Sequence, residues 1–286
     1  MNRLELPPPP TSQPYLPFPP APRTWTNPPP EPPGRRRRRA FLTVAIGLVL
    51  VLLSGVAGVV ASETSRGDPG PLFGGERSHA FIGRSADGEP YRWDPCSTIS
   101  YQIDPGRVGD RIVDDVKEAV RRTSEASGLR FRFDGVVRTS VGELLDEGSF
   151  VTNEAAEGLR WSPILIALRS RAAMRELGVR GALGVTFPVT SRFDADQFVS
   201  GAIVINASAH LEEGFDRAPS FGTVLQHELG HTVGLGHILD PFQLMSPMPV
   251  VTDWGKGDLA GLQELGEGPC LDVPSAEVHA AIVPVP

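Results

Sequence analysis

The sequence predicts an exported domain of the α/β or α+β class, preceded by one membrane-spanning helix. Two observations predict this class. Short runs with the alternation of β-strands lie on both sides of a long run with helical periodicity, and this order favours a sheet covered by helices over a helical bundle. Ahead of these runs, residues 40–61 form an apolar segment without an ionisable side chain.

The apolar segment begins at Ala40 and ends at Ala61. As a helix its 22 residues would extend about 33 Å, enough for the roughly 30 Å hydrocarbon core of a bilayer. Five arginines at residues 35–39 directly precede it. Because positive charge marks the cytoplasmic end of such a helix, we expect the N-terminus in the cytoplasm and everything after Ala61 outside the cell.

A cleavable signal peptide is the competing interpretation. Val59 and Ala61 would suit cleavage after Ala61, which would secrete the domain. However, the 39 residues before the segment and the length of the segment itself both exceed what signal peptides show. We therefore favour an uncleaved, single-pass anchor in the cell membrane.

Composition divides the rest of the chain. Of the 29 prolines, 14 fall before residue 35, so residues 1–39 are expected to form a disordered cytoplasmic tail that ends in the arginine cluster. Residues 62–88 are rich in glycine and are expected to be a linker. The folded domain is expected at residues 89–273, followed by a tail at residues 274–286.

Charge is equally uneven. Residues 1–39 carry a net charge of +5, and because the whole chain carries −7 the remainder carries −12. An acidic exported domain argues against a nucleic-acid partner. Nothing in the sequence indicates an oligomer.

Strand and helix signals follow one another through the domain. Residues 109–127 place apolar side chains at helical spacing and end at Gly128, a helix-stopping residue. Gly184 and Pro188 suit the edge of a sheet better than its centre. Residues 138–161 show no period and are expected to be a loop. The predicted strands are residues 98–103, 129–133, 164–168, 182–189 and 198–207.

One group of residues carries the chemistry. Ser220 can cap a helix in which His227 and His231 lie four residues apart and so project from the same side. Gly234 can adopt a positive φ, end the helix and turn His237 back toward the same point. The sequence therefore predicts a metal site made of three histidines.

Three neutral histidines leave one position of a tetrahedral zinc ion open, which is typical of catalytic rather than structural zinc. Glu228 follows the first histidine and is expected beside the open position. There its carboxylate can take a proton from an attacking water and return it to the leaving amine. These residues predict peptide-bond hydrolysis without a covalent enzyme intermediate.

The run HELGHTVGLGH at residues 227–237 resembles the zinc signature of the metzincin metallopeptidases. The following DPFQLMSP at residues 240–247 resembles the matrixin branch of that family. The resemblance covers roughly residues 90–271, where the chain is similar to secreted matrixin-like proteases of actinobacteria. It implies that Met245 forms an apolar floor beneath the zinc.

The resemblance also implies the fold. It is a twisted, five-stranded mixed sheet with one antiparallel edge strand above the zinc cleft, two long helices, and a C-terminal helix at residues 257–266. Substrate is then expected to add an extended strand to that edge, while residues 247–254 wall the pocket beyond the scissile bond. The residues assigned to the edge are Ala182, Leu183, Gly184, Val185, Thr186 and Phe187.

The chain departs from animal matrixins in its histidines. His79, His210 and His279 are the only others, and they lie far apart in the sequence. We therefore predict one zinc ion, without the second, structural zinc of that family. Asp194 and Asp196 could contribute to a calcium loop, but a solvated acidic turn is the favoured interpretation.

The two cysteines, Cys96 and Cys270, lie near the ends of the region of resemblance. Matrixin zymogens are silenced by a pro-region cysteine on the zinc, but the motif that flanks that cysteine is absent from this chain. Both cysteines are expected outside the cell, where disulfides persist. A disulfide between them is the simpler interpretation.

The favoured function is a membrane-anchored zinc endopeptidase that acts on proteins or peptides outside the cell. A second hypothesis is a cell-surface binding module that keeps the fold without turnover. The presence of the three histidines and of Glu228 weighs against it. A third is a zinc hydrolase that acts on a non-peptide or cell-wall amide.

Overall fold

A computed structural model of the chain describes residues 74–140, 150–154, 158–191, 196–272 and 280–282. The chain divides into two units, Met1–Gly67 and Asp68–Pro286, and every described residue belongs to the second. Among the described residues, no helix is long and apolar enough to cross a bilayer. The predicted span at residues 40–61 lies outside them.

The domain begins with the predicted strand, helix and strand. Strand β1 is Thr98–Asp104, helix α2 is Val113–Ser127 after a short 3-10 turn at Asp110–Ile112, and strand β2 is Arg130–Val136. The helix ends at Gly128, whose φ of 74° is the left-handed conformation that favours glycine. All three elements confirm the sequence prediction to within a few residues at each end.

A mixed sheet forms the centre of the domain, with the strand order β2-β1-β5-β7-β6-β8. Its pairs are parallel from β2 to β7, whereas β6 runs antiparallel to β7 and to β8. Every residue of β7 is buried, as expected of a central strand. The remaining strands are β5 Ile164–Arg169, β6 Gly184–Ser191, β7 Phe198–Asn206 and β8 Ala280–Ile282.

The predicted five strands are present, but two details of the prediction are wrong. A sixth strand, β8, lies in what was expected to be the C-terminal tail, and it pairs with β6 at residues 189–191. Only the first part of β6 is therefore an edge among the described residues. Ala182 and Leu183 come before the strand rather than within it, because the first residue paired with β7 is Gly184.

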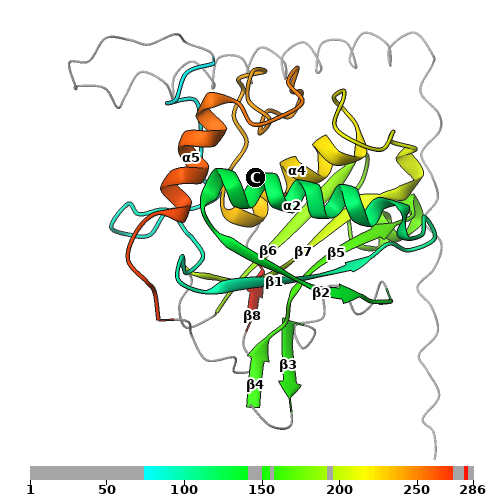
Figure 1. Cartoon of the computed structure of the whole chain (residues 1–286), viewed down its shortest axis with the longest axis horizontal. Helices are drawn as coiled ribbons and strands as arrows, with labels where there is room; N and C mark the ends of the chain where they lie inside the picture. Colours follow the sequence, from blue (N-terminus) through cyan, green and yellow to red (C-terminus); the bar gives the residue numbers. More distant parts are fainter. Residues whose placement is uncertain (1–73, 141–149, 155–157, 192–195, 273–279, 283–286) are drawn as a thin grey trace, which may run out of the picture. The chain divides into compact units, whose positions relative to one another are not determined.

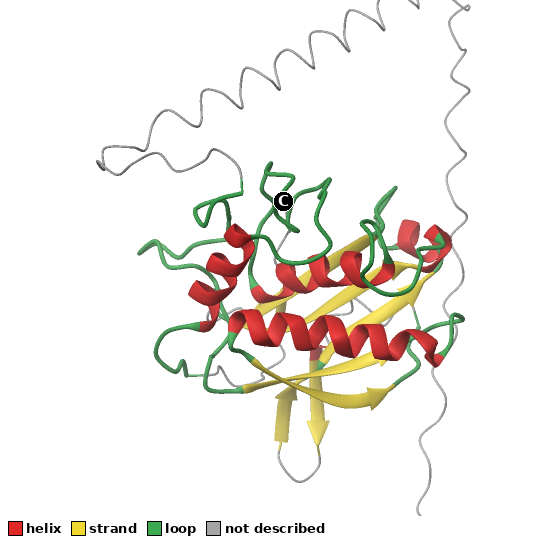
Figure 2. Ribbon diagram, turned by 45° about the horizontal axis from the view of Figure 1, so that its top comes forward, coloured by secondary structure: helices red, strands yellow, loops and turns green. Residues whose placement is uncertain are grey.

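Helices α2 and α4, the latter at Phe221–Val233, cover one face of the sheet, and α5 at Lys256–Gly266 packs against both helices at one end (Figures 1 and 2). The main core lies between them and the sheet, with β-branched strand residues such as Ile103, Ile166 and Ile203 packed against helix residues such as Leu225. The next residues along the strands, such as Ala167 and Val204, face the opposite side, where they pack against Met174 of the short helix α3 at Arg171–Glu176.

A hairpin replaces part of the predicted loop at residues 138–161. Strands β3 at Val151–Glu154 and β4 at Gly158–Trp161 pair antiparallel and project from the sheet (Figure 1). The loop prediction was wrong here because each strand has only four residues. Four residues place two side chains on each face, too few for an alternation to stand out.

The start of the described chain also packs on the domain, although residues 62–88 were expected to be a linker. Phe81 forms a bridge to Leu235, and the backbone N–H of Ile82 donates to the carbonyl of Gly234 at 2.9 Å. The predicted disulfide between Cys96 and Cys270 is present and links positions 174 residues apart. It ties the start of β1 to the chain that follows α5.

Candidate metal centre

Local sequence fixes the helix that carries the first two histidines. Ser220 caps α4 and forms a reciprocal capping box with Thr223. At the other end the helix stops at Gly234, whose φ is 132°. A Cβ there would lie 2.9 Å from the carbonyl oxygen of Tyr91, so both the turn and the close approach require glycine.

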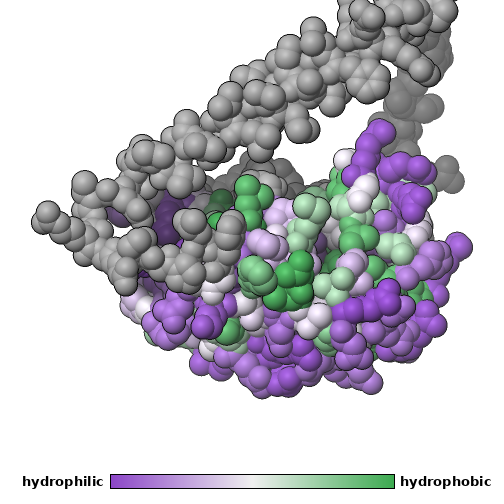
Figure 3. Space-filling view, turned by 90° about the horizontal axis from the view of Figure 1, so that it is seen from above, coloured by the Kyte–Doolittle hydropathy of each residue, from purple (hydrophilic) through white to green (hydrophobic). Residues whose placement is uncertain are grey.

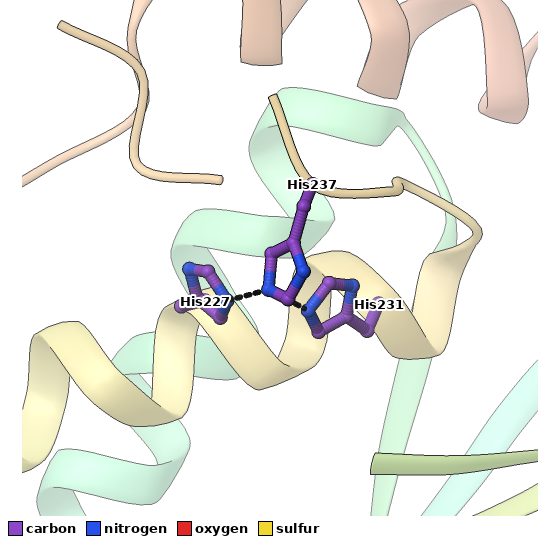
Figure 4. Close-up of side chains that lie close together, drawn as sticks. All are labelled: His227, His231 and His237. Carbon is purple, nitrogen blue, oxygen red and sulfur yellow. Dashed lines mark hydrogen bonds between the residues drawn. The ribbon is translucent and has the colours of Figure 1, made fainter. Parts of the chain in front are cut away.

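The structure brings the three predicted ligand histidines together (Figure 4). The Nε2 atom of His237 lies 3.2 Å from that of His227 and 3.1 Å from that of His231. The Nδ1 atom of His227 lies 2.7 Å from the carbonyl oxygen of Leu244, and that of His231 lies 2.8 Å from the carbonyl oxygen of Leu235. A carbonyl oxygen only accepts a hydrogen bond. In His227 and His231 the Nδ1 atom therefore carries the proton, and the Nε2 atom offers a lone pair.

These lone pairs fit a small divalent cation. Tetrahedral zinc with zinc–nitrogen bonds of 2.0–2.1 Å would hold two ligand nitrogens about 3.3 Å apart, close to the observed spacings. Burial lowers the pKa of His227 to about 4 and the pKa of His231 well below its usual value. Both rings are therefore neutral, as metal ligands must be.

Within the described residues, one other group could be mistaken for a metal site: Asp94 with Cys96 and Cys270. Its two sulfur atoms are bonded to each other, so it offers no thiolate. Of the residues considered for calcium, Asp194 lies outside the described residues and Asp196 is exposed. His279 also lies outside them.

Glu228 lies on the buried side of the histidine cluster, against strand β6. Its Oε2 atom accepts a 2.7 Å hydrogen bond from the hydroxyl of Thr186. A Cβ on Gly184 would lie only 2.6 Å from Oε1, so glycine leaves the space that the carboxylate occupies. Burial raises the pKa of Glu228 to about 7, against the lowering effect of the Thr186 hydrogen bond.

Met245 packs against helix α4, and its role as an apolar floor beneath the zinc stays a prediction of the resemblance. It is 1% exposed, and a Cβ on Gly230 of α4 would lie 2.4 Å from its sulfur atom. Its carbonyl oxygen accepts from the N–H of Ile238 at 3.2 Å. The turn at Leu244 and Met245 is therefore bonded to the segment that carries His237.

Two buried side chains that the sequence did not single out, Asp258 and Gln243, connect the turn to the start of helix α5 by hydrogen bonds. The carboxylate of Asp258 accepts from the N–H groups of Leu244 at 2.5 Å and of Gly255 at 2.9 Å. The side-chain oxygen of Gln243 accepts from the N–H of Gly257 at 2.8 Å. The only signal in the sequence was the position of Asp258 three residues after Gly255, where an N-terminal helix cap is expected.

The histidines and Glu228 open into a cleft of about 610 Å³. Five of the six residues assigned to the substrate strand line it, whereas Phe187 packs on the other face of the sheet. Of the predicted wall at residues 247–254, Pro247, Met248 and Pro249 line the cleft. Residues of the strand and of the predicted wall therefore line the same cleft as the histidines.

Comparison with known proteins gives little more. No family model matches the chain, and no curated protein matches it. Among 58 matching chains of solved structures is metalloproteinase-II from Bacteroides fragilis, at 11% identity and a TM-score of 0.31. The match covers 63% of this chain and about half (54%) of that one. A likeness at this level does not by itself identify a function.

Proposed function

We propose that the chain is a zinc-dependent endopeptidase. One observation carries the proposal: three imidazoles direct their Nε2 atoms to one point in an open cleft, and a buried carboxylate lines the same cleft. An open metal position beside a carboxylate is the arrangement that hydrolysis of an amide requires. His227, His231 and His237 would hold the ion.

When bound, zinc would supply a Lewis acid that makes water nucleophilic at neutral pH and polarises the scissile carbonyl. The chain supplies the proton transfer. Glu228 accepts a proton from the attacking water at a carboxylate oxygen, the hydroxyl oxygen bonds to the carbonyl carbon, and the C–N bond breaks as Glu228 returns the proton to the amine nitrogen. Thr186 holds Oε2 in place, which leaves Oε1 for this transfer.

The geometry of β6 supports an extended substrate. The N–H of Asn206 donates to the carbonyl of Leu183, so this pair and the pair of Val185 with Val204 are the hydrogen-bonded ones. The backbone groups of Gly184 and Thr186 therefore point away from β7 and toward the cleft. A peptide that lies along β6 can bond to both.

The test is digestion of casein and of a peptide library by the detergent-solubilised full chain loaded with zinc. We expect cleavage that a chelator abolishes, and a loss of about 10³-fold in kcat/KM for Glu228→Gln, with zinc content unchanged. Glu176→Gln, an exposed carboxyl on α3, is the matched control. Cleavage that survives Glu228→Gln contradicts the mechanism.

The proposal includes a place in the cell. Residues 40–61 would anchor the chain with its N-terminus in the cytoplasm and the peptidase domain outside. The length of the apolar segment and the arginines before it support this. Carbonate-resistant membrane association together with digestion of the domain by protease added to intact cells is the expected result. Recovery of a domain that starts after Ala61 in the medium contradicts it.

A further inference from the structure

The loop between α4 and α5, gold to orange in Figure 1, has an unusual surface. From residue 238 to residue 252 its only ionisable side chain is Asp240, which is 2% exposed. Large apolar side chains point into solvent instead. We call them the apolar loop surface: Leu239 (84% exposed), Phe242 (52%), Met248 (82%) and Val250 (67%).

A backbone contact brings two of these positions together. The N–H of Val250 donates to the carbonyl of Pro241 at 2.9 Å, so the backbone at Val250 lies beside the chain that leads into Phe242. Figure 3 looks onto the side that lies at the top of Figure 1, and apolar side chains gather over the middle of it. Soluble proteins rarely expose a contiguous apolar patch unless it binds something.

The cleft does not account for the surface. Met248 lines the cleft, but Leu239, Phe242 and Val250 do not. A peptide bound along β6 would therefore leave those three side chains in water. Something other than this peptide must cover these three side chains if they are to be removed from water.

The chain joins the domain at this surface. The N–H of Gly74 and the hydroxyl of Ser78 both donate to Oδ2 of Asp240 at 2.6 Å. A Cβ on Gly74 would lie 3.9 Å from the Cβ of Phe242. Only residues 62–73 separate Gly74 from the apolar segment, and that length of chain can extend at most about 45 Å.

We propose that the apolar loop surface rests on the bilayer that holds residues 40–61, with its four side chains at the boundary between headgroups and acyl chains. The proposal depends on the membrane anchor of the proposed function. Once anchored, the domain stays within the reach of residues 62–73, and the loop at residues 238–252 beside the tether exposes no charge, although Glu76 and Arg77 are exposed nearby in the sequence. Apolar side chains in this position gain free energy by leaving water for the interface.

A consequence concerns the substrate. Met248 belongs both to the apolar loop surface and to the cleft. The cleft therefore opens close to the bilayer, and the polypeptides that reach it most readily are segments near the membrane. Exported chains tethered to the same membrane are the expected substrate class.

The experiment uses the full chain reconstituted into phosphatidylcholine vesicles, with and without bromine on the acyl chains. The variants Phe242→Trp and Leu239→Trp each add an indole to the surface, and the emission added relative to the parent chain is measured. We expect brominated lipid to quench most of it. Val136→Trp, a 46% exposed position at the end of β2, is the control and should be unaffected.

A further variant, Leu50→Trp, reports on the anchor. If brominated lipid quenches the Leu50→Trp indole but neither loop indole, the anchor stands and the docking proposal is wrong. If it quenches none of the three, the anchor itself fails. If the loop indoles respond to the number of protein molecules per vesicle rather than to bromine, a second copy of the chain covers the surface and the proposal is overturned.

Discussion

The two walls of the cleft are built by different means. The strand wall, β6 from Gly184 to Thr186, is fixed by its hydrogen-bond ladder to β7. The loop wall, residues 246–249, belongs to a loop at residues 238–254 that contains no helix or strand. The backbone N–H groups of that loop donate to the buried carboxylates of Asp240 and Asp258, and the side chain of Gln243 in the loop accepts from the first turn of α5.

This difference decides which substitutions each wall tolerates. A ladder is made of backbone groups, so the strand wall should tolerate new side chains except where one meets Glu228. The loop wall depends on a few carboxylate and amide oxygens, and each of them serves several donors. Single side-chain changes should therefore damage the loop wall more than the strand wall.

The largest effect is expected for Asp258→Ala. It leaves the buried N–H groups of Leu244, Met245 and Gly255 without an acceptor, at a cost of about 4 kcal/mol in the free energy of unfolding. Urea unfolding of the solubilised chain measures this, and zinc affinity should fall as well. Asp258→Asn keeps one acceptor oxygen and should lose less. Equal stability of Asp258→Ala and the parent chain would show that the loop wall does not depend on this carboxylate.

The second-largest effect, on activity, is expected at Gly184, the position of the strand wall that contacts Glu228. In Gly184→Ala the new methyl group meets Oε1 of Glu228, and a displacement of about 1 Å should lower kcat/KM about 100-fold. Zinc content and unfolding should change little. Glu176→Gln, at an exposed position on α3, is the control; if Gly184→Ala keeps full activity, Glu228 does not need its present position.

Lowering the pH should destabilise the loop wall more than the strand wall. Burial opposes ionisation of Asp240, but hydrogen bonds from Ser78, Gly74 and Gln243 outweigh it and lower the pKa to about 2. Because the folded pKa lies below the unfolded value of about 3.9, the carboxylate stabilises the fold above that value by about 2 kcal/mol, and this is lost as pH falls through 2. The free energy of unfolding is measured between pH 5 and pH 2 for the parent chain and for Asp240→Asn. It should fall more steeply with falling pH in the parent chain, and an identical pH dependence refutes this role of Asp240.

The smallest effect is expected for Thr186→Val, which removes one hydrogen bond to Glu228 and keeps the shape of the side chain. We expect kcat to fall about tenfold with little change in KM. Thr186→Ser should restore most of the activity, because it restores the hydroxyl. A fall in KM alone, or no rescue by serine, would mean that Thr186 does not position the carboxylate.

The sequence predicted α2, α4 and the long strands because each has a period or a stop signal, whereas α5 was expected from the resemblance and the short helix α3 was not predicted. Gly128 and Gly234 end α2 and α4 where expected. The spacing of His227 and His231 on one helix placed both side chains correctly, since one turn of a helix is a local property. The hairpin of β3 and β4 had no comparable signal, and β8 was missed because its partner lies about ninety residues earlier in the chain.

The rest of the site depends on contacts between distant segments. Gly184 was interpreted only as a sign of an edge strand, but it also leaves space for the carboxylate of Glu228, 44 residues later. Likewise Asp258 was not singled out in the sequence, yet its carboxylate accepts from the N–H of Met245 as well as from the N–H of Gly255 at the start of α5. Neither role can be found from local pattern, because it arises only when the sheet and the helices are packed together.

The bonds of Gly74 and Ser78 to Asp240 have a mechanical consequence. The disulfide closes a loop from Cys96 to Cys270, and Gly74 lies outside it. A pulling force applied to the chain before Gly74 is therefore carried first by two hydrogen bonds to a single carboxylate, three residues after His237. Tension on the tether would load the histidine loop before it reached any covalent cross-link.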